Sequence, residues 1–234
     1  MASIKLKHTS GNGTILNSPA ANPSSDITLK LPSTTGSAGQ VLQVASANHS
    51  STNAELEFAA VSNDFVKIST SSVSSAVAQV DLDFDTSTYS QVLMFMEGFK
   101  FASDAVNLYA RFKVGGTVQT SGNYVSQTVK SHQGGFDSSQ YGGQDQTYMY
   151  ITNNIGNTGY ENWNGQLRLQ LGSGNANGLA FMTITTFYRD PSGNYAVNQG
   201  GAGYQDTSSV VNGIRFYASS GNITSGKITL YGMK

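Results

Sequence analysis

The chain is divided into short segments of alternating apolar and polar residues, and this period restricts it to β-structure. The last of them, residues 223–232, carries apolar residues at alternate positions, as a strand with one buried face requires. Gly-Gly, Ser-Gly and Asn-Gly pairs separate the segments and favour turns. No segment has a sustained helical period. The sequence therefore predicts an all-β fold whose main part is an antiparallel, jelly-roll-like β-sandwich.

The candidate strands recur regularly after residue 63. They cover residues 65–69, 76–84, 91–99, 107–114, 124–129, 147–152, 166–171, 180–188, 196–204, 210–218 and 227–231. Residues 92–96 (VLMFM) are continuously apolar, which predicts a central strand covered on both faces. Residues 181–188 form a second core candidate, and residues 189–194 (RDPSGN) predict a tight turn after it.

The distribution of large apolar residues divides the chain near residue 62. Residues 1–62 hold one aromatic residue, Phe58, and three of the four prolines, whereas residues 63–234 hold the only Trp and all twelve Tyr. The alternating pieces of the first part are each too short to bury a face of their own. We therefore expect a short-strand N-terminal segment, residues 1–62, and a C-terminal sandwich domain, residues 63–234. The alternative for residues 1–62 is a disordered polar tail.

Several blocks of the sequence are similar to parts of a known group of proteins, and those from residue 89 onward agree with them in order. They are residues 2–8 (ASIKLKH), 31–44 (LPSTTGSAGQVLQV), 54–58 (AELEF), 89–98 (YSQVLMFMEG), 102–112 (ASDAVNLYARF), 122–124 (GNY) and 212–232 (NGIRFYASSGNITSGKITLYG). In these blocks the chain resembles β-rich virion structural proteins of tailed bacteriophages, including phages of marine cyanobacteria. Those proteins are fibre, appendage and head-decoration subunits.

This resemblance implies a non-enzymatic virion structural protein that is assembled in the host cytoplasm. The N-terminal segment would dock on other virion proteins, which are head, portal, tail or fibre-adaptor proteins. The C-terminal sandwich would then project from the particle or cover it. Tail fibre and capsid decoration both stay open as locations. The alternative function is a carbohydrate-binding tip that recognises host surface glycans.

The N-terminal segment has few large apolar side chains, and these are the candidates for virion docking. They are Ile4, Leu6, Ile15, Leu16, Ile27, Leu29 and Leu31. Burying each contributes about 1.5–3 kcal/mol, whereas ordering one backbone residue costs roughly 1–2 kcal/mol. Residues 1–31 therefore need partner surface in order to become ordered. Other copies of this chain are one expected partner, and a homotrimer is expected because closed cyclic symmetry is a common solution.

Composition and charge exclude several kinds of partner and cofactor. Thirteen Lys and Arg against fourteen Asp and Glu leave a net charge of −1, so we expect no nucleic-acid partner. Residues 1–8 lack the apolar core of a secretory signal and no run approaches 18 apolar residues, so no membrane insertion is expected. Cysteine is absent, which excludes disulfides and zinc-thiolate sites. No cofactor is expected.

No catalytic constellation can be assembled from the sequence. The glutamates Glu55, Glu57, Glu97 and Glu161 are scattered, and the histidines His8, His49 and His132 fit neither a metal triad nor a Ser-His-Asp set. Asp81, Asp83 and Asp85 alternate, so a strand would place them on one face at a spacing that suits a calcium ion. The other interpretation is a solvated strand face that ends in a turn, and no metal site is predicted.

One region, residues 134–165, interleaves aromatic rings with amide side chains and glycines. Its aromatic candidates are Tyr141, Tyr148, Tyr150, Tyr160 and Trp163. Rings beside amide groups stack on sugar rings and bond their hydroxyls, so a glycan-binding loop is one hypothesis. The other is that these rings fill the core or subunit contacts.

Overall fold

The computed structural model of the chain is built from β-strands. It describes the backbone of residues 3–7 and 13–17, and residues 24–47, 50, 53–61, 64–171, 180–205 and 210–234; the side chains of residues 136–140 are outside this description. No helix occurs within these ranges, so the expected all-β class is confirmed. The chain divides into two compact units, residues 1–63 and residues 64–234.

The strands of the first unit are short, and most of those of the second unit are long. The first unit contains β1 (Ser3–Lys7), β2 (Gly13–Asn17), β3 (Thr28–Lys30), β4 (Gln40–Val44) and β5 (Asn53–Ala60). The second contains β6 (Phe65–Val73), β7 (Gln79–Asp83), β8 (Gln91–Phe101), β9 (Val106–Val114), β10 (Thr117–Val118), β11 (Tyr124–His132), β12 (Gly135–Gln146), β13 (Met149–Ile155), β14 (Trp163–Gln170), β15 (Ala180–Arg189), β16 (Tyr195–Tyr204), β17 (Val211–Ala218) and β18 (Ile223–Met233).

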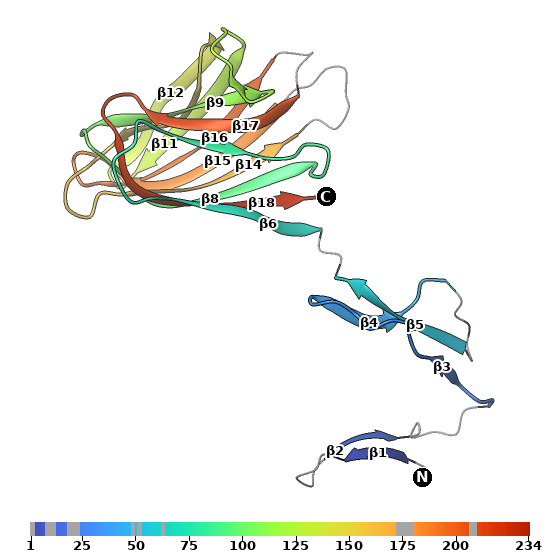
Figure 1. Cartoon of the computed structure of the whole chain (residues 1–234). Coiled ribbons are helices and arrows are strands. Elements are labelled where there is room, and N and C mark those ends of the chain that lie inside the picture. Colours follow the sequence, from blue (N-terminus) through green and yellow to red (C-terminus); the bar gives the residue numbers. More distant parts are fainter. Residues whose placement is uncertain are drawn as a thin grey trace. The chain divides into compact units, whose positions relative to one another are not determined.

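Two antiparallel sheets make up the second unit and face each other (Figure 1). The larger sheet has eight strands in the order β12-β11-β16-β15-β14-β8-β18-β6. The smaller sheet has the order β10-β9-β17-β7, and β13 pairs with β9 along a second stretch of that strand. The chain passes repeatedly from one sheet to the other, for example from β7 to β8 and from β17 to β18. The expected antiparallel β-sandwich is therefore confirmed.

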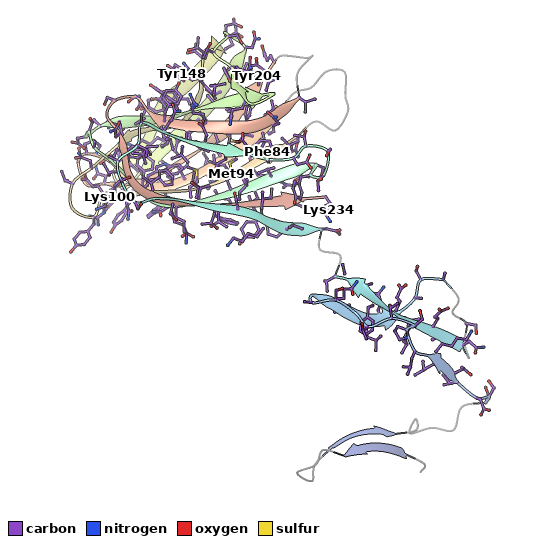
Figure 2. All side chains as sticks on the ribbon, viewed as in Figure 1. Phe84, Met94, Lys100, Tyr148, Tyr204 and Lys234 are labelled. Atoms are coloured by element: carbon purple, nitrogen blue, oxygen red, sulfur yellow. The ribbon has the colours of Figure 1, made fainter. Side chains whose placement is uncertain are left out.

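The core lies between the two sheets because side chains alternate along each strand. In β8, Val92, Met94 and Met96 point inward and are fully buried, and Figure 2 shows Met94 among the side chains between the layers. Leu93 and Phe95 lie on the opposite face and are only partly covered. The expectation that residues 92–96 are covered on both faces is wrong for this outer face, because the smaller sheet covers only the inner one.

A bulge at Gly98 keeps the second half of β8 in the core. Gly98 has a φ of 64°, a conformation that favours glycine, and its N–H donates to Asn164 Oδ1 at 2.9 Å. The pairing of β8 with its neighbours shifts on either side of this residue. Before the bulge the inward residues have even numbers, as in Val92, Met94 and Met96, and after it they have odd numbers. Phe99 and Phe101 consequently face the core.

Polar side chains hold β13 against the larger sheet. One edge of β13 pairs with β9, and at the other edge two side chains of the larger sheet take the place of a neighbouring strand. Asn198 Nδ2 donates to the Ile151 carbonyl at 2.8 Å, and Ser126 Oγ accepts from the Tyr150 N–H at 3.0 Å. These bonds satisfy backbone groups that an unpaired edge would leave without partners.

A buried ion pair lies in the same polar layer. Lys130 Nζ is 3.2 Å from Asp190 Oδ2, and both side chains are almost completely buried. Asp190 Oδ1 also accepts the N–H groups of Ser192 and Asn194, which closes the expected turn after β15. Burial by itself raises the pKa of Asp190, but the hydrogen bonds from Asn194, Lys130 and Ser192 outweigh it and hold this pKa below its usual range.

The first unit has little core of its own. β1 pairs antiparallel with β2, and β5 pairs with β3 in parallel and with β4 antiparallel. Of the described residues of this unit whose side chains are placed, only Ala45 is a buried hydrophobic residue. Gly36 passes close over the ring of Phe58, where an added Cβ would be 2.5 Å from a ring carbon. Backbone pairing therefore accounts for most of the order in this unit.

The structure contains strands that the sequence pattern does not predict. β12 has a polar, glycine-rich sequence (GFDSSQYGGQDQ) without alternation, and it pairs with β11 through its backbone. β10 has two residues and β2 pairs with β1 through its backbone. Backbone hydrogen bonds to a neighbouring strand are sufficient to hold such segments. They therefore need no alternation of apolar and polar residues, and the sequence pattern cannot predict them.

We expect the buried Lys130–Asp190 pair to be important for stability. Lys130→Ala leaves the buried Asp190 carboxylate without its cation and should lower the free energy of unfolding by about 3 kcal/mol. Lys227→Ala is the matched control, because Lys227 pairs with Glu97 at the surface and its loss should cost less than about 1 kcal/mol. Urea denaturation of the full chain measures both values, and equal losses would contradict the burial of the first pair.

Candidate functional site

Three of the five predicted aromatic candidates come together with two further tyrosines. We call Tyr109, Tyr141, Tyr148, Tyr150 and Tyr217 the tyrosine cluster. In the smaller sheet Tyr109 of β9 pairs with Tyr217 of β17 on one side and with Tyr150 of β13 on the other. The three side chains therefore form a row across the outer face of that sheet, with Tyr148, labelled in Figure 2, beside it.

The rings of the tyrosine cluster pack mainly on one another. The ring centroids of Tyr109 and Tyr148 are 4.1 Å apart and those of Tyr141 and Tyr150 are 5.8 Å apart, both stacked. Tyr109 also contacts Tyr150 and Tyr217 edge-on, at 5.3 and 5.7 Å. All five side chains are partly covered. Much of the aromatic surface that could stack on a sugar is thus already used within the cluster.

Arg111 closes the tyrosine cluster on one side. Its guanidinium lies 5.1 Å from the centre of the Tyr217 ring, and its Nε donates to the Thr147 carbonyl at 2.8 Å. Burial raises the pKa of the Tyr148, Tyr150 and Tyr217 hydroxyls above the usual value, and neighbouring tyrosines add to this effect. The cluster therefore behaves as a small packed core on the surface of the smaller sheet.

The other two aromatic candidates lie elsewhere. Tyr160 is 87% exposed and belongs to the loop between β13 and β14. Trp163 is completely buried, with its ring 5.8 Å from that of Phe99 and over Gly165, which has no side chain to displace it. For Trp163 the glycan-binding hypothesis is wrong, and the other interpretation, a ring that fills the core, is confirmed by this burial. Trp163 is a core residue of the sandwich.

The three alternating aspartates have separate protein partners. Asp81 accepts two hydrogen bonds from Arg215, each at 2.7 Å, and Asp83 lies 2.5 Å from Lys113 Nζ. Asp85 accepts from the Ser87 N–H and from the hydroxyls of Ser87 and Thr88, and these bonds lower its pKa to about 2. Within the described part of the chain, no three acidic or histidine side chains come together as metal ligands.

The apolar docking candidates whose side chains are described are exposed. Ile27, Leu29 and Leu31 lie on or beside β3, and Leu31 is 77% exposed. Val41, Leu42 and Val44 of β4 are exposed as well, although the docking prediction did not include them. The backbones of β1 and β2 bring Ile4 opposite Leu16 and Lys5 opposite Ile15, whereas the side chains of Ile4, Leu6, Ile15 and Leu16 lie outside the described residues.

Two grooves on the outer face of the larger sheet were not predicted from the sequence. One, of about 290 Å³, lies between Phe95 of β8 and Phe187 of β15, over β14. The other, of about 530 Å³, runs beside Phe181 of β15 over Gly201 and Gly203 of β16. We call them the Phe187 groove and the Phe181 groove. The sequence does contain a signal for these grooves. Side chains alternate along β15, so that Phe181 and Phe187 point outward when Met182 and Ile184 point inward.

Comparison with protein-family models, with curated proteins and with solved structures found no match to this chain. In addition, none of the described segments forms a helix of the length and hydropathy needed to cross a membrane. A functional conclusion therefore depends on the geometry of the exposed strands, the tyrosine cluster and the two grooves, together with the resemblance of the sequence blocks.

We expect the tyrosine cluster to be visible in an alkaline titration followed by tyrosinate absorbance. Because burial raises the folded-state pKa of Tyr148, Tyr150 and Tyr217, some of the twelve tyrosines should ionise well above pH about 10. The stability that they contribute is complete below that pH and is lost as the pH rises through the raised pKa values. Tyr217→Phe should remove part of the late-ionising signal, and urea-unfolded protein is the control. Simultaneous ionisation of all tyrosines in the folded protein would contradict the packing.

Proposed function

We propose that the protein is a non-enzymatic structural subunit of a tailed-bacteriophage virion. Its N-terminal unit docks on the particle, and its C-terminal sandwich is displayed on the particle or covers it. The observation that carries this proposal is the exposure of the apolar side chains of β3 and β4. A small sheet that leaves such side chains uncovered gains stability when another protein surface buries them.

The strand edges of the N-terminal unit support the same role. β3 and β4 lie on either side of β5, so each has a second edge that pairs with none of the other described strands and can take up a strand of a partner. Strand addition at such an edge supplies main-chain hydrogen bonds, and the flanking apolar side chains supply contact area. Partners of this kind are further copies of the chain, giving a homotrimer, and the virion protein on which the trimer docks.

The homotrimer can be tested by placing a charge on the exposed strand. The full chain should sediment at three times its mass of 24.7 kDa, and Leu29→Asp should shift it to the single-chain mass because a carboxylate cannot be buried there without a large cost. Val210→Asp is the control, since Val210 is similarly exposed, 66% against 59% for Leu29, but belongs to the sandwich. A wild-type chain that sediments as a monomer at all concentrations would contradict the trimer.

Docking can be tested separately on purified particles. Deletion of residues 2–31 removes β1, β2 and β3 but no strand of the sandwich, so it should give a folded protein that is missing from the particles. Quantitative immunoblotting of the particles and circular dichroism of the purified variant measure the two effects. Incorporation of the truncated protein at normal occupancy would place the docking surface in the sandwich and overturn the assignment of roles.

The second candidate function is recognition of a host glycan by the sandwich. The observation that favours it is the pair of grooves on the outer face of the larger sheet, where aromatic rings occur together with amide and hydroxyl side chains and, in the Phe187 groove, with Glu97. This combination is typical of sites that bind sugars, which present both apolar ring faces and hydroxyl groups. Displaying such a face is compatible with a virion subunit that is anchored by its other unit.

A further inference from the structure

The two grooves belong to one continuous band of outward-facing residues. Across the sheet, Phe95 of β8 pairs with Gln166 of β14, which pairs with Thr185 of β15, which in turn pairs with Gln199 of β16. The next row contains Arg168, Thr183, Gly201 and Gln127, and the row after it contains Gln170, Phe181, Gly203 and Val125. Phenylalanines therefore lie on both sides of a band of amide and hydroxyl groups.

The spacing of the grooves suits an extended ligand. Phe181 and Phe187 lie on the same side of β15, six residues apart, which corresponds to about 20 Å along a strand. Thr183 and Thr185 stand between them and are exposed, as is Gln199 on the neighbouring strand. A chain of several rings could place one ring in each groove and its hydroxyl groups over the polar band.

The aromatic wall of the Phe187 groove is held in place by its neighbours. Phe187 stacks on Tyr195 with ring centroids 5.7 Å apart and planes inclined by 15°. Arg189 lies over the Tyr195 ring at 4.3 Å and donates a hydrogen bond to its hydroxyl. On the other side of the groove, Asn164 is fixed by its hydrogen bond to the bulge at Gly98. A fixed wall lowers the entropy lost when a ligand binds.

Most polar groups of this band are uncharged amides and hydroxyls, which suits a neutral ligand. Among the residues that line the two grooves, the charged one is Glu97 of β8, which pairs with Lys227 Nζ at 2.5 Å. On the outward faces of β11, β14, β15 and β16, the charged described residues are Arg168 and, at the end of β15, Arg189. Both are engaged, since Arg168 donates to Gln91 Oε1 and Arg189 to Tyr195. The remaining polar groups are amides and hydroxyls, which both donate to and accept from sugar hydroxyls.

We propose that this band, with the Phe187 groove at one end and the Phe181 groove at the other, binds a neutral oligosaccharide. The two phenylalanines stack on pyranose rings, and Gln166, Thr185 and Gln199 bond hydroxyl groups between them. This inference rests on the second candidate function, glycan recognition, and is independent of docking by the N-terminal unit. The tyrosine cluster, which lies on the smaller sheet, has no part in this binding.

The test measures binding of the full chain to an array of oligosaccharides. The neutral set consists of linear hexasaccharides of glucose, galactose and mannose, and the acidic set consists of sialylated and uronate-containing oligosaccharides. Wild-type protein should bind a member of the neutral set, and calorimetry should give its affinity. Phe181→Ala and Phe187→Ala should each weaken binding about tenfold, equivalent to about 1.4 kcal/mol. Thr185→Val, which keeps the volume but removes the hydroxyl, should weaken it severalfold.

Phe65→Ala is the matched control. Phe65 lies on β6 at the far edge of the same sheet and is 44% exposed, against 45% for Phe181. All four substitutions are at partly or largely exposed positions, and circular dichroism checks that each variant is folded. The proposal requires that Phe65→Ala binds as wild type does.

Three results would overturn the proposal. They are absence of binding to every neutral oligosaccharide, equal losses in the Phe65 and Phe181 variants, and binding confined to the acidic set. If the phenylalanine variants change only the sedimentation mass, the band is an interface between copies of the chain and not a saccharide site. Particle incorporation of the Phe181→Ala and Phe187→Ala variants should stay normal, so failure here and failure of the docking role are distinguishable.

Discussion

The alternation of side chains along each strand is the constraint on which the rest of this structure depends. In the larger sheet it assigns Met94, Met182 and Ile184 to the core and leaves Phe95, Phe181 and Phe187 on the opposite face. The smaller sheet can cover only one of these faces. Residues at the outward positions of the larger sheet therefore lie outside this core, and the proposed saccharide band consists of such residues.

Where a strand is irregular, specific residues restore the burial of its side chains or the hydrogen bonds of its backbone. Gly98 supplies the bulge that returns Phe99 to the core, and Asn164 satisfies the N–H that the bulge exposes. Along β13, side chains of the larger sheet bond backbone groups that pair with none of the described strands. The Lys130–Asp190 pair lies in this layer, where low dielectric makes an unpaired charge costly. Two of the polar side chains inside the sandwich, Asn198 and Ser126, thus serve the backbone of β13.

The sequence predicted the fold class and most strands of the sandwich, because those strands alternate strongly. It could not predict β12, since a polar, glycine-rich segment is held by the backbone of β11 and has no period of its own. Within the candidate site, it found Tyr141, Tyr148 and Tyr150 but not Tyr109 and Tyr217, which come from distant strands and join the cluster only through sheet pairing. The sequence alone could not distinguish Trp163 from the other aromatic residues of the 134–165 region. Its burial depends on the space that Gly165 leaves for the indole ring, and this space is seen only in the folded structure.

The two proposed roles reinforce each other energetically. Stacking of one or two rings on a sugar, with a few hydrogen bonds in water, gives weak binding by a single site. A trimer held by the exposed strands β3 and β4 would carry three such faces, and a particle would carry many. Binding of a second face then takes place at a high effective concentration, which raises the overall affinity by about 10² to 10⁴ when the geometry allows it. Exposed apolar strands that lead to assembly are therefore the feature that would make a shallow saccharide groove sufficient for attachment.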